Sequence, residues 1–105
     1  MTTFDERESA FENKFAHDAE MEFMAESLRD KGIAYWAAEK LGMSTAEAAG
    51  YAKNLIKADF SEPGSEVVVR KLVADLKDVA DEAEIRAKMD EILEIARKKV
   101  FGDEA

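Results

Sequence analysis

Apolar residues recur along most of the chain at spacings of three and four, which places their side chains on one face of a helix. The clearest case is the segment from about 82 to 100, whose predicted inner face comprises Ile85, Met89, Ile92, Leu93, Ala96 and Val100. Asp81 and Glu84 are spaced as an N-terminal capping box, and Gly102 supplies a stop signal. This segment is therefore predicted to be a helix.

The segment from about 62 to 79 shows the same spacing, with a predicted inner face of Val69, Leu72, Val73, Leu76 and Val79. Pro63 is acceptable in the first turn of such a helix. The run Val67-Val68-Val69 is also typical of a strand, but a single strand would have no partner in this sequence. A helix is the better prediction.

Two further helices are predicted upstream. Ser44 and Glu47 form a capping box at the start of a helix over about 44–58, with an inner face of Ala48, Tyr51, Ala52, Leu55 and Ile56. The preceding helix covers about 17–41 and ends at Gly42; its apolar residues are Met21, Met24, Ala25, Leu28, Ile33, Tyr35, Trp36, Ala37 and Leu41. Gly32 inside it weakens the helix and predicts a bend or a close helix contact.

Four helices joined by short links predict an all-α, single-domain four-helix bundle over residues 17–101. Residues 1–16 differ, because their large apolar side chains after Met1 are only Phe4, Phe11 and Phe15, which share one side of a helix. One hypothesis is that this segment extends the first helix and packs its phenylalanines on the bundle. The favoured one is a mobile N-terminal arm that folds into a groove on a partner.

Charge supports the second hypothesis. Residues 1–30 hold nine acidic and three basic residues, a net −6, whereas residues 31–60 hold three acidic and four basic residues, a net +1. A segment so rich in acidic residues gains little from packing on its own acidic domain.

The whole chain has 105 residues and a net charge of −9, which argues against nucleic-acid binding and against docking on anionic lipid. No stretch is apolar enough for a membrane span or an export signal, so we expect a cytoplasmic protein with no direct membrane insertion.

The search for catalytic chemistry finds little. The chain has one histidine and no cysteine, so it offers neither a usual zinc site nor a thiol nucleophile. His17 is expected to be a solvated helix residue and Trp36 a core residue rather than a platform for a base. No phosphate-binding glycine loop follows a strand. We expect a protein that is not an enzyme and that binds no metal.

Several short strings, taken in order, resemble the zeta-subunit family of alpha-proteobacterial ATP synthase inhibitors. They are Phe15-Ala16-His17-Asp18, Phe23, Trp36-Ala37-Ala38-Glu39, Leu41-Gly42, Tyr51-Ala52-Lys53, Ala58-Asp59-Phe60, Glu62-Pro63-Gly64 and Arg70-Lys71. The resemblance implies a small four-helix protein that binds the catalytic head of the F-type ATP synthase and blocks ATP hydrolysis through its N-terminal segment. It also implies weak binding of ADP or ATP on the bundle, at a site that no motif locates.

Carried onto this sequence, the resemblance makes the arm the inhibitory element. Its expected partner-binding residues are Phe4, Arg7, Phe11, Lys14 and Phe15, the phenylalanines as anchors and the two basic residues as rim contacts. No cofactor is expected to be required, and the free protein is expected to be monomeric. Two alternatives stay open: a small helical domain that senses adenine nucleotides, and an acidic helical adaptor with an unrelated partner.

Overall fold

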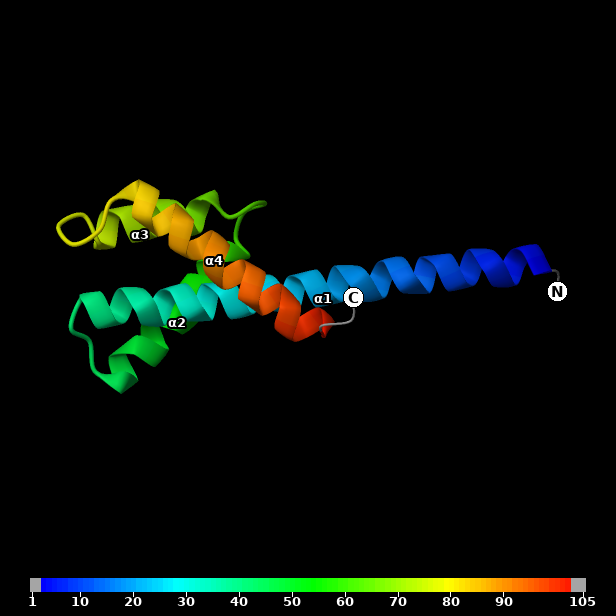
Figure 1. The fold of residues 1–105 in the computed structure, drawn as a ribbon, viewed down its shortest axis with the longest axis horizontal. Coiled ribbons are helices and arrows are strands. Elements are labelled where there is room, and N and C mark those ends of the chain that lie inside the picture. The colour runs from blue at the N-terminus through cyan, green and yellow to red at the C-terminus, as the bar shows by residue number, and fades with distance from the viewer. Residues whose placement is uncertain (1–2, 103–105) are drawn as a thin grey trace.

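The computed structural model describes residues 3–102, with side chains described for residues 17–102. It contains the four helices α1 (Thr3–Lys40), α2 (Thr45–Asp59), α3 (Glu66–Asp75) and α4 (Glu82–Phe101), and no strand occurs within this described range. Helix α1 packs against α2 and α4, and α3 packs against both of these helices (Figure 1). The predicted all-α four-helix architecture is confirmed.

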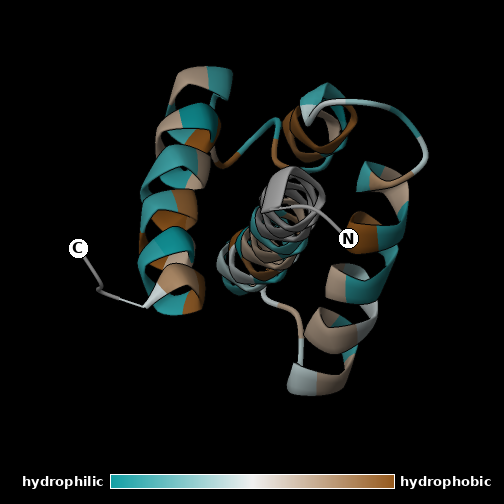
Figure 2. Cartoon of the chain, turned by 90° about the vertical axis from the view of Figure 1, so that its right-hand side faces the viewer, coloured by the Kyte–Doolittle hydropathy of each residue, from teal (hydrophilic) through white to brown (hydrophobic). Residues whose placement is uncertain are grey.

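Helix α1 is the axis of the molecule and accounts for its elongated shape, which measures 62 × 28 × 27 Å. Viewed along the molecule, α2, α3 and α4 surround the C-terminal half of α1, while its N-terminal part extends beyond them (Figures 1 and 2). The helix predicted to begin near residue 17 therefore begins at Thr3. Residues 3–16 continue into the bundle without a helix break, as expected if this segment extends the first helix. Mobility of the arm in the free protein stays a prediction.

The core lies where the C-terminal half of α1 meets the other three helices. It is built from Ile33, Ala34, Ala37, Ala52, Leu55, Val68, Val69, Leu72, Leu76, Ile85 and Met89. Half-buried Trp36 packs against this cluster, in agreement with the sequence prediction. Alanine contributes much of the α1 face, which allows the partner helices to approach closely.

The predicted helix signals at three positions are confirmed. Ser44 and Glu47 form a complete capping box at the start of α2, and the Asp81 side chain accepts a hydrogen bond from the Glu84 N–H at the start of α4. Gly42, two residues after the end of α1, adopts a φ of +71°, which residues with an L side chain rarely adopt. Local capping chemistry fixes these boundaries.

Helix α3 is shorter than the predicted 62–79. Pro63 lies in the turn before it rather than in its first turn, and Leu76 ends it, with the Val79 N–H bonded to the Leu76 carbonyl. Leu76 is still buried, but Val79 is 46% exposed. The apolar spacing continued past the helix because a turn brings Leu76, but not Val79, back onto the core.

Gly32 marks the predicted close helix contact. A Cβ atom added there would lie 2.8 Å from the Ile92 Cγ2 atom of α4, well inside ordinary van der Waals distance. Glycine at this position therefore lets α4 cross directly over α1. None of the described helices combines the length and apolar character that crossing a membrane requires.

Candidate functional site

The five predicted partner-binding residues, Phe4, Arg7, Phe11, Lys14 and Phe15, all fall on the N-terminal part of α1. Their side chains lie outside the described residues, so their proposed contacts stay predictions. What the structure adds is their backbone: all five belong to one uninterrupted helix that also enters the bundle.

Helical register relates the arm to the bundle. Phe15, Glu22 and Arg29 are spaced by seven residues, and positions seven apart in an α-helix differ by only about 20° around its axis. Arg29 is buried in the bundle. Glu22 accepts two hydrogen bonds from the guanidinium of Arg97 in α4, with N–O distances of 2.6 and 3.0 Å. The phenylalanine positions therefore follow, in register, the line of α1 that faces the other helices.

A cleft of about 360 Å³ lies beside the C-terminal end of α2, where α2 meets α1. The rings of Phe23 and Phe60 stack at its edge with centroids 4.6 Å apart, and they are 53% and 46% exposed. The turn Ser61–Ser65 forms its other side. The sequence analysis did not assign a site here, although Phe23 and Phe60 belong to the strings that carry the family resemblance.

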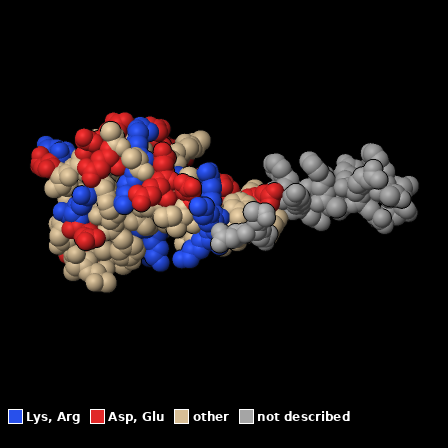
Figure 3. Space-filling view, viewed as in Figure 1, with Lys and Arg blue, Asp and Glu red and all other residues tan. Residues whose placement is uncertain are grey.

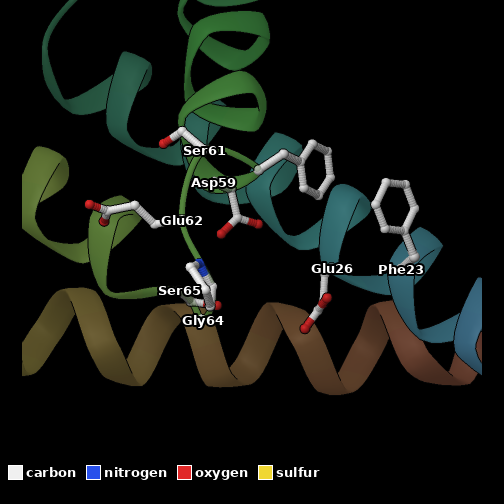
Figure 4. A pocket seen from close by; sticks show the side chains of 9 residues that line it. Phe23, Glu26, Asp59, Ser61, Glu62, Gly64 and Ser65 are labelled. Carbon is white, nitrogen blue, oxygen red and sulfur yellow. The ribbon is translucent and has the colours of Figure 1, made fainter.

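The cleft has an acidic lining. Glu26, Asp59 and Glu62 contribute to it, and none of its lining residues is a lysine or arginine. Glu62 is bound to Arg70, with an N–O distance of 2.6 Å, whereas the carboxyl of Asp59 points into the space between Glu26 and Glu62 (Figure 4). Such a lining repels phosphate groups, so this cleft is a poor candidate for a nucleoside triphosphate site.

Beneath the cleft lies a buried charged cluster that the sequence analysis missed. Arg29 donates through Nε and Nη2 to Asp30 Oδ1, at 3.0 and 2.9 Å, and through Nη2 to Asp59 Oδ2, at 3.3 Å. All three residues are buried. One signal was present: Arg29 stands midway between buried Ala25 and Ile33, four residues from each, and so occupies a core position of α1.

Polar contacts elsewhere are structural. The Tyr51 hydroxyl donates to Asp75 Oδ2 at 2.7 Å, and burial followed by this bond raises the pKa of Tyr51. Lys40 Nζ lies 5.0 Å from the centre of the Trp36 ring, which covers one face of the indole. His17 is exposed, as predicted.

Acidic and basic side chains intermingle over the visible face of the bundle rather than forming one charged field (Figure 3). Within the described residues, no group of three or more histidine, aspartate or glutamate side chains is placed to hold a metal ion. The described residues thus present a mixed-charge surface and a buried ionic cluster.

The comparison with protein-family models agrees with the sequence resemblance. A search of curated proteins found no match to the chain. The family model described as ATPase inhibitor subunit zeta matches residues 1–99, which is nearly the whole length and includes both the arm and the bundle. The chain therefore belongs to the ATPase inhibitor subunit zeta family.

Proposed function

We propose that the protein inhibits ATP hydrolysis by the catalytic head of the F-type ATP synthase, with its N-terminal arm entering a catalytic subunit interface as a helix. Membership of the inhibitor family supports the inhibitory role. The observation that supports the arm as the inhibitory element is the continuity of α1 from Thr3 to Lys40.

Continuity matters because starting a helix is unfavourable by a factor of about 10³, whereas extending one is nearly neutral per residue. An isolated 16-residue segment would bear this cost when it binds. In the intact chain the bundle already provides the first turns, so the arm only has to propagate α1. The bundle therefore lowers the free energy needed to present a helical arm.

The gain on binding would come from the phenylalanines. Each fully buried phenylalanine side chain contributes about 1.5–3 kcal/mol, and three of them can offset the ordering of a short segment. Arg7 and Lys14 would pair with acids at the rim, where charge affects association rate more than affinity. Insertion of such a helix between two subunits would oppose the domain motions that hydrolysis requires.

The first experiment compares the full chain with a variant lacking residues 1–16 in an assay of ATP hydrolysis by the isolated catalytic head. The bundle retains its own core, so we expect the truncated chain to keep its helicity and cooperative melting and to lose inhibition. A truncated chain that still inhibits fully would refute the role of the arm. A peptide of residues 1–16 should inhibit much less than the full chain; equal inhibition would refute the contribution of the bundle.

Single substitutions test the anchors. Phe11→Ala or Phe15→Ala should weaken inhibition by about 1–4 kcal/mol, and Phe4→Ala should have a smaller effect because it lies near the helix end. Asn13→Ala is the matched control, since Asn13 lies about 200° around the helix from Phe11. Melting temperatures measured in parallel separate an interface anchor, which changes inhibition alone, from a residue that also stabilises the fold.

A further inference from the structure

The cluster of Arg29, Asp30 and Asp59 joins the middle of α1 to the C-terminal end of α2. Their exposed fractions are 4%, 0% and 6%. One guanidinium thus serves two carboxyl groups, through a single Nη2 atom that reaches both. If both carboxyls were ionised, the cluster would carry a net negative charge in a site largely removed from water, which is strongly unfavourable.

The hydrogen bonds of the cluster are also incomplete. Asp30 Oδ2 is buried and has no donor. The carboxyl groups of Asp30 and Asp59 meet at the same Arg29 Nη2 atom, which lies 2.9 Å from Asp30 Oδ1 and 3.3 Å from Asp59 Oδ2. Two carboxylates cannot bond to each other, because neither has a proton to donate. One proton placed on either group would neutralise the excess charge and supply the missing bond.

We propose that Asp30 and Asp59 share one proton in the folded protein, and that this proton holds the C-terminal end of α2 against α1 until alkaline pH removes it. The arrangement is that of two carboxyls sharing a site, where one is held protonated by the other and by burial. The proposal concerns the bundle alone and does not depend on the inhibitory function.

Charged groups approach the cluster from every element packed against it, and acids predominate among them: Glu26 of α1, Glu62 of the α2–α3 turn, Glu66 of α3, and Arg86 and Asp90 of α4. Arg86, the cation of this set, is already bound to Glu66 at 2.7 Å and to Glu82 at 2.8 Å. A proton is therefore the available compensation for the second carboxyl.

The direction of the titration follows from these surroundings. Burial, reinforced by the hydrogen bond with Asp59 and opposed by Arg29, raises the pKa of Asp30 to about 8. In the unfolded chain an aspartate titrates near pH 4. The folded state therefore retains a proton that the unfolded state has lost, so stability falls as pH rises from about 4 to about 8.

Loss of the proton would act on the cleft. Asp59 lines the cleft and precedes Phe60, whose ring stacks on Phe23 of α1. Repulsion between two buried carboxylates would separate the end of α2 from α1 and disrupt this stack. The acidic cleft would then change shape over the same pH range.

The test is a carboxyl-detected NMR titration of the full chain from about pH 4 to pH 10, with the Phe60 amide and ring signals followed in the same samples. We expect one aspartate carboxyl to titrate near pH 8 together with a shift of the Phe60 signals. Carboxyls that all titrate below about pH 6 would overturn the proposal. This measurement needs no variant, so it decides the matter even if a substitution prevents folding.

Variants then locate the proton. Asp30→Asn provides an uncharged amide that donates permanently, and Asp59→Asn does the same from the other side. Each should abolish the alkaline transition and the accompanying fall in melting temperature, whereas Asp78→Asn, which removes the same charge from an exposed turn, should leave both unchanged. Persistence of the transition in both buried variants would overturn the proposal.

Discussion

Replacement of Gly32 by alanine tests the close crossing of α1 and α4. Alanine in place of glycine inside a helix normally stabilises a protein by about 0.5–1 kcal/mol. At Gly32 the new Cβ atom would lie 2.8 Å from Ile92 Cγ2, a branched methyl close to the α4 backbone. Such overpacking typically lowers the free energy of unfolding by about 1–3 kcal/mol. We therefore expect Gly32→Ala to be neutral or to destabilise the fold by up to about 2 kcal/mol.

Gly50 provides the matched control. It lies inside α2, and a Cβ atom there would meet nothing within 4 Å. Gly50→Ala should thus show the helix-propensity gain alone, and the two variants should differ by about 1–3 kcal/mol. Urea unfolding followed by circular dichroism measures this difference directly.

The Ile92→Ala background identifies the cause, because it removes the methyl group that the new Cβ atom would meet. In that background Gly32→Ala should stabilise the protein as Gly50→Ala does, and the resulting coupling energy should approach the difference between the two glycines. If Gly32→Ala stabilises the unmodified chain as much as Gly50→Ala, the crossing is looser than the structure indicates and our reasoning is wrong.

Three further predictions concern charge and ligands. Arg29→Met should destabilise the bundle by about 3–5 kcal/mol at neutral pH, because it leaves buried carboxyls without their cation; a loss under about 1 kcal/mol in urea unfolding would contradict this. Arg7→Ala and Lys14→Ala should change mainly the association rate with the catalytic head and its salt dependence, which stopped-flow measurements at several ionic strengths would show. ATP should bind the bundle only weakly, with a dissociation constant of about 10 μM to 1 mM. An NMR titration measures it, and a much tighter constant would favour the nucleotide-sensing alternative.

The sequence predicted the elements whose causes are local. The capping pairs Ser44–Glu47 and Asp81–Glu84 act over three residues, and a short reading window contains everything they need. At Gly32 the sequence predicted a bend or a close helix contact, and the structure shows the close contact. The resemblance added the inhibitor family, which no local pattern indicated.

The sequence failed where burial depends on distant partners. Met24 and Leu28 belong to the apolar residues of the predicted first helix, yet they are 52% and 38% exposed, while Arg29 and Asp30 are buried. Hydropathy ranks these residues in the opposite order. The ranking is reversed because Asp59, about thirty residues later, completes an ion pair that makes the burial of Arg29 tolerable. No pattern within one helix contains that information.

Because α1 is unbroken, the arm and the α1 segment inside the bundle belong to one continuous helix. Its 38 residues span about 57 Å at about 1.5 Å each. Each residue turns the helix by about 100°, so the number of residues between the arm and the bundle fixes the direction in which the arm side chains point relative to the bundle. Insertion of one residue between Asp18 and Met21 would turn every arm position by about 100°, whereas seven inserted residues would restore the azimuth to within about 20° and displace the arm by about 10 Å. A partner that contacts both the arm and the bundle would respond to the rotation of the arm about the helix axis as well as to its displacement along that axis. The bundle would then set the orientation of the arm as well as its position.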